Sequence, residues 1–302
     1  MLIELYDKVV VKGVRPAIPS DIPKSLADLI CACWAGDPAA RPPFQVIVDT
    51  LDKVICELEI PSPSAREWWT RSFGATAVRV PWSPFVNAFC HDFSIVASNI
   101  LVEDVMLSPN PQCVTVAKYL TCFRALIVDK DNEDEVVVEK FGEAVAWLGD
   151  IPKHARRIIV VAAKLLGQKY FFGDISKEES ERLLNGKPPG TFLVRFSTTS
   201  LGGYTVSRVT REYAIMHVRL KHHPGALEYG YGSCVAKSLP EIIEVISKTL
   251  SLEFPCSGWP FSYLFDEGRT APGVYGYENE DCELAEDDGD IGDDDDDDDE
   301  MK

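Results

Sequence analysis

Apolar residues near the amino terminus recur at intervals of three and four, which is the spacing of one face of an α-helix. We predict a helix through Leu26 and Cys33 that ends at Asp37 and Pro38. A second predicted helix buries one apolar stripe and stops before Pro61. The stripe consists of Ile47, Leu51, Val54, Ile55 and Leu58.

The stretch from 65 to 166 also follows helical spacing, so we predict a helical module there. Helices are expected around Arg66–Phe73, Ser83–Phe93 and Lys140–Leu148, and an acidic turn, Asp129–Glu135, separates two apolar stretches. The best candidate for a membrane span, Ile158–Leu166, is far shorter than the ~20 residues that a membrane helix needs, and it contains Lys164.

Short alternating runs replace the helical spacing after residue 170. Ser176 and Glu179 form a capping box at the start of a predicted helix. Strands and a last helix follow, at Thr191–Arg195, Tyr204–Ser207, Ile215–Leu220 and Leu239–Thr249. This order predicts an α+β unit of about a hundred residues.

The net charge of the 302-residue chain is −18, and it is concentrated at the carboxy-terminal end. From Gly276 to Lys302 there are 16 acidic residues and one lysine. We expect 276–302 to be a disordered acidic tail, because like charges repel and nothing there can be buried. The remainder is nearly neutral, which argues against nucleic-acid binding.

The nine cysteines are odd in number and scattered, with no C-x-x-C pair and no histidine at zinc-ligand spacing. We therefore expect no disulfide, no metal and no cofactor. Glu4 and Asp7 lie where a secretory signal would be basic and then apolar. The expected location is the cytoplasm, with no membrane span.

Arg195 is an anomaly within an apolar strand. Strand alternation sends Phe192, Val194 and Phe196 to one face and Arg195 to the other. A buried guanidinium needs an anion. The hydroxyls and backbone amides of the following loop, 197–203, are donors that a phosphate accepts from. The alternative is a structural salt bridge to a nearby carboxylate.

Three motifs around this arginine resemble the Src-homology-2 (SH2) family in order and spacing. They are F-F-G-D-I-S-K-E-E-S-E-R-L-L from Phe171, G-T-F-L-V-R-F-S from Gly190 and G-Y-T-V-S from Gly203. The resemblance implies that 168–266 is an SH2 domain, in which two helices flank a central antiparallel sheet. It also implies binding to tyrosine-phosphorylated proteins.

The resemblance assigns roles to individual side chains. Arg195 matches the phosphate-binding arginine, and the loop hydroxyls join it. The full phosphotyrosine-binding set that it implies is Arg195, Ser197, Thr198, Thr199, Lys177, His217 and Arg219.

Four neighbouring positions have other expected roles. Val218 matches the position that shapes selection of ligand residues after the phosphotyrosine, and an apolar residue there favours apolar ligand residues. The alternative is that Val218 is simply a strand residue. Tyr170 replaces a usual tryptophan, at a position that packs rather than binds. His222 and His223 are expected to lie in a solvated turn, without a metal.

The helical module, 65–166, resembles the EF-hand-like domain that precedes the SH2 domain of Cbl proteins, on A-R-E-W-W-T-R-S-F-G from Ala65. Asp129, Asp131 and Glu133 match carboxylate positions of its calcium loop. Asp134 stands where a glycine is needed, and Lys140 replaces the bidentate glutamate, a second mismatch. We expect a vestigial loop that does not bind calcium.

Residues 1–60 resemble the end of a tyrosine-kinase-like catalytic domain, on L-I-C-A-C-W-A-G-D-P-A-A-R-P-P-F from Leu29. Trp34, Asp37 and Arg41 match structural positions of that family. The Gly-rich loop, strand lysine, catalytic-loop aspartate and metal-binding aspartate are absent from this sequence. The chain as given is not expected to bind ATP as a kinase does.

The order of these segments resembles the carboxy-terminal part of SH2-bearing protein kinases. Either a truncated sequence or the loss of catalytic lobes would explain it. The leading hypothesis is a phosphotyrosine-dependent binding module in signalling. The alternative is that the full-length product is an active ATP-dependent protein kinase targeted by its SH2 domain. A ubiquitin ligase is set aside because no ring of Cys/His ligands follows.

Tyr275 and Tyr277 suggest a self-regulatory variant of this hypothesis. They lie in the acidic context G-V-Y-G-Y-E-N-E-D, just after the SH2-like segment. Phosphorylated, either could occupy Arg195 in cis or in trans. Acidic flanks that merely keep a tail soluble are the alternative.

Overall fold

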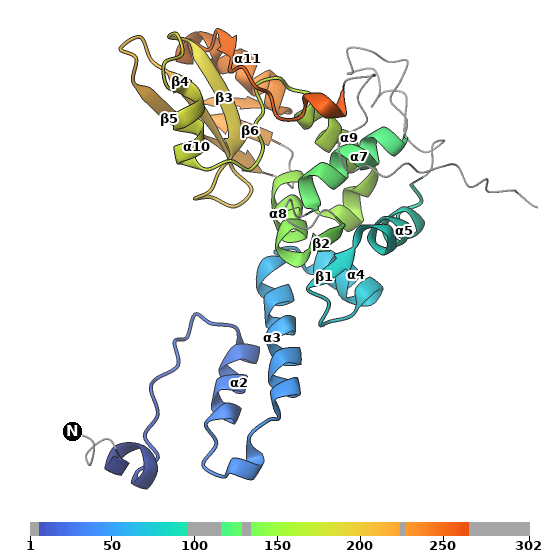
Figure 1. Cartoon of the computed structure of the whole chain (residues 1–302), viewed down its shortest axis with the longest axis vertical. Coiled ribbons are helices and arrows are strands. Elements are labelled where there is room, and N and C mark those ends of the chain that lie inside the picture. Colours follow the sequence, from blue (N-terminus) through green and yellow to red (C-terminus); the bar gives the residue numbers. More distant parts are fainter. Residues whose placement is uncertain (1–5, 96–115, 129–133, 224–227, 266–302) are drawn as a thin grey trace, which may run out of the picture. The chain divides into compact units, whose positions relative to one another are not determined.

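The computed structural model describes residues 6–95, 116–128, 134–223 and 228–265 (Figure 1). All of them belong to one compact unit. Three calcium-loop positions, Asp129, Asp131 and Glu133, lie outside the described residues, as do Tyr275, Tyr277 and the acidic tail. No helix in the described ranges is both long and apolar enough to span a membrane.

The amino-terminal region forms the two predicted helices. A π-helical turn, η1 (Asp7–Val11), precedes α2 (Lys24–Cys33), and a 3-10 turn, η2 (Pro38–Ala40), leads to α3 (Phe44–Glu59). The first helix ends at Cys33, four residues before Asp37. The Asp37 carboxylate accepts the Ala39 N–H at 2.9 Å and thereby caps η2.

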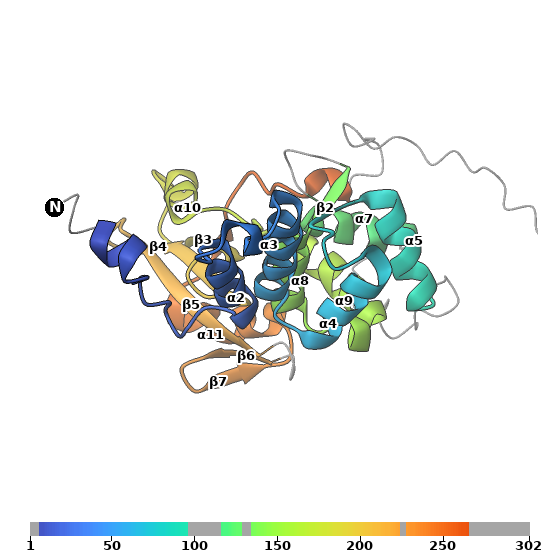
Figure 2. The same cartoon turned by 90° about the horizontal axis from the view of Figure 1, so that it is seen from below.

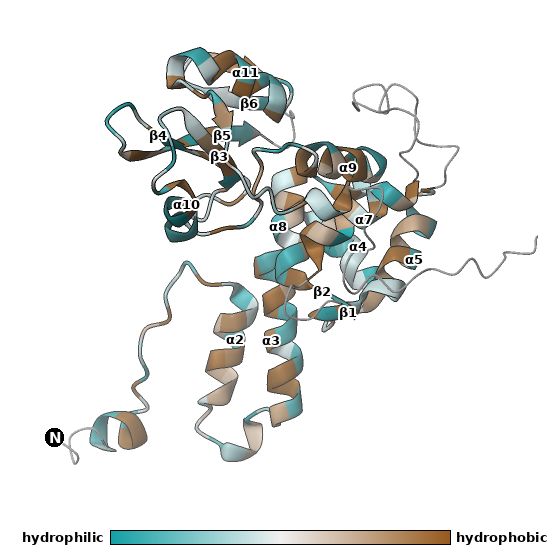
Figure 3. Cartoon of the chain, turned by 45° about the horizontal axis from the view of Figure 1, so that its top comes forward, coloured by the Kyte–Doolittle hydropathy of each residue, from teal (hydrophilic) through white to brown (hydrophobic). Residues whose placement is uncertain are grey.

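Within the predicted stripe of α3, Val54 is buried and the other four residues are partly or largely exposed. Val54 is 3% exposed, whereas Leu51 and Leu58 are 39% and 57% exposed. α3 packs against α2 on one side and α8 (Val138–Leu148) on another. Figure 3 shows hydrophobic segments along both α2 and α3. The carboxy-terminal half of α3 thus packs on the helical module through α8.

The middle of the chain is helical as predicted. Its helices are α4 (Pro63–Phe73), α5 (Trp82–Asp92), α7 (Val116–Ile127), α8 and α9 (Ile151–Leu166). Aromatic rings dominate the core, where Trp69 lies 4.8 Å from Phe141 between ring centroids. An antiparallel ribbon of β1 (Arg79–Pro81) and β2 (Glu135–Val137) was not predicted, because three-residue strands are too short to show alternation.

Within the described residues, the carboxy-terminal region holds a six-stranded sheet in the order β7-β6-β5-β4-β3-β8. Neighbouring strands pair antiparallel, except that β3 and β8 are parallel. The strands are β3 (Thr191–Phe196), β4 (Tyr204–Val209), β5 (Ile215–His223), β6 (Glu228–Tyr231), β7 (Cys234–Ala236) and β8 (Phe254–Pro255). The α+β class with a central, largely antiparallel sheet is confirmed.

Two helices cover opposite faces of this sheet, α10 (Lys177–Leu184) and α11 (Leu239–Leu250) (Figure 2). Leu193 of β3 packs with Leu184 of α10 in a small cluster. Val194, the next residue, belongs to the large core that includes Ile242 of α11. The alternation predicted for β3 is therefore confirmed, and Arg195 shares the α10 face with Leu193.

Candidate phosphate-binding site

Arg195 is the last residue but one of β3, and only 4% of its surface is exposed. One guanidinium nitrogen, Nη1, donates to the carbonyl oxygen of Phe196 at 3.1 Å, and Nε is buried without a hydrogen-bond partner. No ion pair to Arg195 occurs in the part of the chain that the structure describes. The alternative of a structural salt bridge therefore finds no support there.

Strand register gathers polar side chains around this arginine. Arg195 pairs with Thr205 of β4, which in turn pairs with Arg219 of β5. Two residues further along the strands, Ser207 lies opposite His217. Because facing residues share a face of the sheet, all five side chains are on the α10 side.

The loop after β3, residues 197–203, contacts Arg219 through Thr199. Arg219 Nη2 donates to Thr199 Oγ1 at 2.6 Å, and the Ser197 hydroxyl lies 3.5 Å from that oxygen. The backbone N–H of Ser197 donates to the Gly203 carbonyl at 2.9 Å. Ser197 is buried, whereas Thr198 and Thr199 are exposed. The structure thus brings Ser197, Thr199 and Arg219 together. The Thr198 side chain is exposed at the edge of the site.

Helix α10 covers the face of the sheet that carries Arg195 and its polar neighbours. Its N-cap is Ser176, whose hydroxyl accepts the Glu179 N–H at 3.0 Å, which is one half of the predicted capping box. The Glu179 carboxylate pairs with Arg182 instead. The Glu181 carboxylate lies 3.1 Å from His217 Nε2 and 3.6 Å from the Lys177 ammonium. Glu181 therefore bridges two of the side chains that the resemblance assigns to the phosphate.

The other ring nitrogen of His217 fixes the orientation of the ring. Nδ1 lies 2.9 Å from the hydroxyl of Ser207, which is fully buried. Ser207 in turn donates to the Ser180 hydroxyl of α10 at 3.5 Å. The imidazole is thereby held between the sheet and the helix.

The charges at this site oppose one another. Burial lowers the pKa of the Arg195 guanidinium, and the carboxylates of Glu178, Asp174 and Glu181 counteract that effect. The hydrogen bond from His217 lowers the pKa of the Glu181 carboxyl. Arginine stays protonated at neutral pH, so a buried cation faces a rim that carries both carboxylates and cations.

Three residues of the site, Thr205, Ser207 and Glu181, were not predicted from the sequence. Polar residues alternate with apolar ones in β4, which was a signal for the first two. Glu181 follows Lys177 by four positions, a spacing that places two side chains on one helix face. Its contact with His217 depends on how helix and sheet pack, which no local pattern reveals.

The other sequence-predicted positions fall into two groups. Val218 is half-buried on the α11 side of β5, and Tyr170 packs against the large core, as a packing residue should.

The prediction for His222 was wrong. It lies inside β5, its Nδ1 is 3.0 Å from the Gly202 carbonyl oxygen, and its ring stacks on Tyr229 at 4.4 Å. His223 also belongs to that strand rather than to a turn.

The kinase-like positions make local contacts. Arg41 Nε donates to the Ala35 carbonyl at 3.0 Å, and the carbonyl of Trp34 accepts from Arg15 at 3.2 Å. Together with the cap at Asp37, these bonds fix the turn between α2 and α3. They do not reach the sheet, so they form no part of the phosphate site.

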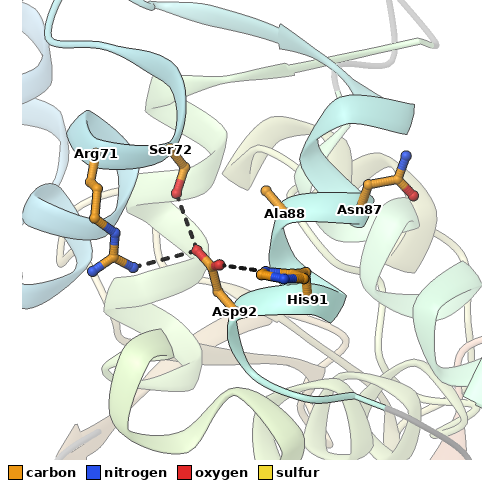
Figure 4. A pocket seen from close by; sticks show the side chains of 6 residues that line it. All are labelled: Arg71, Ser72, Asn87, Ala88, His91 and Asp92. Atoms are coloured by element: carbon orange, nitrogen blue, oxygen red, sulfur yellow. Dashed lines mark hydrogen bonds and ion pairs between the residues drawn. The ribbon is translucent and has the colours of Figure 1, made fainter.

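A pocket lies between α4 and α5, and charged side chains that pair with one another line it (Figure 4). Asp92 lies at its centre and accepts from Trp68 Nε1 at 2.9 Å and from Arg71 and Ser72 at 3.4 Å each. His91 lies 3.0 Å from the other carboxylate oxygen. These contacts tie the two helices together, which is a structural role.

The family of the carboxy-terminal region is decided by a direct match. The model of the family described as SH2 domain matches residues 170–245. The chain carries an SH2 domain. The matched residues run from Tyr170 through β3, β4 and β5 into α11, and thus include Arg195 and every side chain described around it.

The chain is also homologous over most of its length to kinases of Dictyostelium discoideum. It is 34% identical to "Dual specificity protein kinase shkA" over 259 residues, which cover 84% of this chain and 49% of that protein. For "Dual specificity protein kinase shkC" the identity is 34%, with coverages of 80% and 46%. The chain thus spans about half the length of these relatives.

A shorter match concerns a different kinase. A probable LIM domain-containing serine/threonine-protein kinase of the same organism is 50% identical over 46 residues, or 15% of this chain and 7% of that protein. So short a match shows only that one segment of the chain resembles part of that kinase.

Proposed function

We propose that this chain binds tyrosine-phosphorylated proteins, with Arg195 as the main ligand of the phosphate. The observation that carries the proposal is the buried guanidinium, which has an unpartnered Nε and no carboxylate within ion-pair distance among the described residues. Leaving a buried charge unpaired is unfavourable, so such an arrangement indicates an anion that binds from outside.

The surrounding side chains suit a phosphate dianion. Arg195 can give two parallel hydrogen bonds, and Ser197, Thr198 and Thr199 offer hydroxyl donors. Arg219 reaches the same loop through Thr199. Lys177 and His217 stand on the helix side, where they would flank the phosphotyrosine ring. Val218, on the other face of β5, would contact ligand residues that follow the phosphotyrosine.

We propose the following domain borders for this account. They are a kinase-like carboxy-terminal fragment at 1–60, an EF-hand-like helical module at 65–166, the SH2 domain at 168–266 and an acidic tail at 276–302. The homology to dual specificity protein kinases supports a role in cytoplasmic signalling, as part of a longer kinase. The second candidate function belongs to that longer protein. It would be an ATP-dependent kinase that the SH2 domain directs to phosphorylated partners.

The test is a selection from a phosphotyrosine peptide library, because the ligand is unidentified. The 302-residue chain is immobilised and exposed to the library before and after phosphatase treatment. We expect enrichment of phosphorylated peptides only, with apolar residues after the phosphotyrosine. Equal capture after phosphatase treatment would refute the proposal.

Glu181→Gln is expected to strengthen phosphopeptide binding by a factor of about 2 to 5 at low salt. In the unliganded protein the Glu181 carboxylate holds His217 and Lys177, and it would repel an arriving dianion. Titration calorimetry at low and high salt measures the effect, which screening should reduce.

Glu179→Gln is the matched control for this change. Glu179 lies on the same helix but pairs with Arg182. The Glu179→Gln substitution removes one negative charge but leaves the contacts of Glu181 with His217 and Lys177 in place. If both variants strengthened binding equally, net charge rather than the Glu181 bridge would be responsible.

A further inference from the structure

Helix α8 of the helical module contacts one end of the loop 197–203, which we call the phosphate loop. The Trp147 ring stacks on the Phe196 ring with centroids 3.6 Å apart and planes 4° from parallel. Both rings are buried, at 4% and 1% exposed. Phe196 lies between Arg195 and Ser197, so the stack fixes the backbone at the point where β3 becomes the loop.

The same helix holds the other end of the loop. Gly202 has a φ of +78°, and a Cβ added there would lie 2.7 Å from the carbonyl oxygen of Ala146. Only glycine permits this close approach of two backbones. The Gly202 carbonyl is itself 3.0 Å from His222 Nδ1. Consecutive residues of α8, Ala146 and Trp147, thus contact opposite ends of one loop.

A third contact reaches the segment before α10. The Lys140 ammonium, near the start of α8, donates to Asp174 at 2.7 Å and to Glu143 at 2.9 Å. Burial lowers the pKa of Lys140, but these hydrogen bonds outweigh it and the net shift is upward. Asp174 is one of the carboxylates that act on Arg195. Lys140, which replaces the calcium-loop glutamate, therefore neutralises an anion at the rim of the phosphate site.

We propose that α8 is a positioning element for the phosphate loop, with Trp147 and Ala146 fixing its two ends, so that phosphotyrosine binding needs the helical module. This inference rests on the proposed function. Hydroxyls and amides of 197–203 must stand within hydrogen-bond distance of one phosphate at the same time. A loop that is already ordered loses less conformational entropy when the phosphate binds.

Trp147→Ala tests the first contact in the full chain. We expect phosphopeptide affinity to fall roughly tenfold, because the loop must then be ordered on binding. Trp147→Phe keeps a ring that can stack, and it should recover most of the affinity. This recovery is possible because the Trp147 Nε1 makes no hydrogen bond among the described residues.

Phe89→Ala is the matched control for loss of stability. Phe89 is fully buried in the same module, in α5, and stacks on Phe85 rather than on the sheet. The measurements are made at a temperature at which all variants are folded by circular dichroism. Phe89→Ala should then change the affinity less than about twofold, since its effect is on unfolding alone.

Gly202→Ala tests the second contact, with Gly186→Ala as its control. Gly186 has a similar φ of +71°, but an added Cβ would meet nothing within 4 Å. Both changes introduce backbone strain, and only the first pushes the loop away from Ala146. We expect Gly202→Ala to weaken phosphopeptide binding by about tenfold or more and Gly186→Ala to leave it within about twofold.

Amide hydrogen exchange of 197–203 without ligand gives a reading independent of binding. Faster exchange in Trp147→Ala, together with its lost affinity, would support the inference. Unchanged exchange and unchanged affinity would overturn the inference while leaving the proposed function intact. A wild-type chain that bound phosphorylated and unphosphorylated peptides equally would overturn both.

Discussion

Replacing Arg195 by methionine is expected to weaken phosphotyrosine-peptide binding at least ~100-fold, or by about 2.7 kcal/mol. Methionine fills much of the same space without a charge or a hydrogen-bond donor. The remaining hydroxyls and Arg219 would retain only weak attraction for a phosphate. Titration of the variant with a peptide selected from the library measures the loss.

The same change should leave the unliganded protein as stable as before, or more stable. Arg195 is 4% exposed, and burial of its guanidinium without an anion is unfavourable, as the lowered pKa also indicates. Thermal unfolding without ligand therefore separates the two roles. A large loss of stability would mean that Arg195 is a structural residue with a partner, and would contradict the account of the site.

Gly142→Ala is expected to destabilise the protein by at least ~2 kcal/mol, although alanine is the better helix former by about 1 kcal/mol. Gly142 lies in α8, where an added Cβ would be 1.9 Å from the Glu59 carbonyl oxygen and 2.7 Å from its carbon. Backbone atoms cannot rotate away as a side chain can. The end of α3 must therefore separate from α8.

Urea unfolding of Gly142→Ala, with Gly36→Ala as control, measures this effect. Gly36 also lacks a positive φ, and an added Cβ there would meet nothing within 4 Å. Limited proteolysis should release 1–60 faster from the Gly142 variant only. Equal stability of the two variants would contradict the contact between α3 and α8.

Periodicity predicted what depends on neighbours along the chain. α3 and α11 each repeat apolar residues at helical spacing over more than two turns, so their existence could be predicted. Strand alternation placed Arg195 on the face opposite to Val194 for the same reason. The identities of the phosphate-site residues were assigned through the SH2 resemblance, which also provided their spacing.

Contacts between distant segments could not be predicted. The His222 prediction was wrong because β5 continues beyond Leu220, where His222 pairs with Tyr229 of β6. No local pattern marks that continuation. The bridge from Glu181 to His217 and the stack of Trp147 on Phe196 likewise depend on packing angles. Such angles are set by the whole core rather than by any single run of residues.

One paired titration tests the central claim most directly. A single library-selected peptide is prepared with phosphotyrosine, with phosphoserine at the same position, and unphosphorylated, and each form is titrated into the 302-residue chain. We expect the phosphotyrosine form to bind at least ~100-fold tighter than either other form, because both the dianion and the ring must be recognised. Equal affinity for the phosphotyrosine and unphosphorylated forms would contradict it.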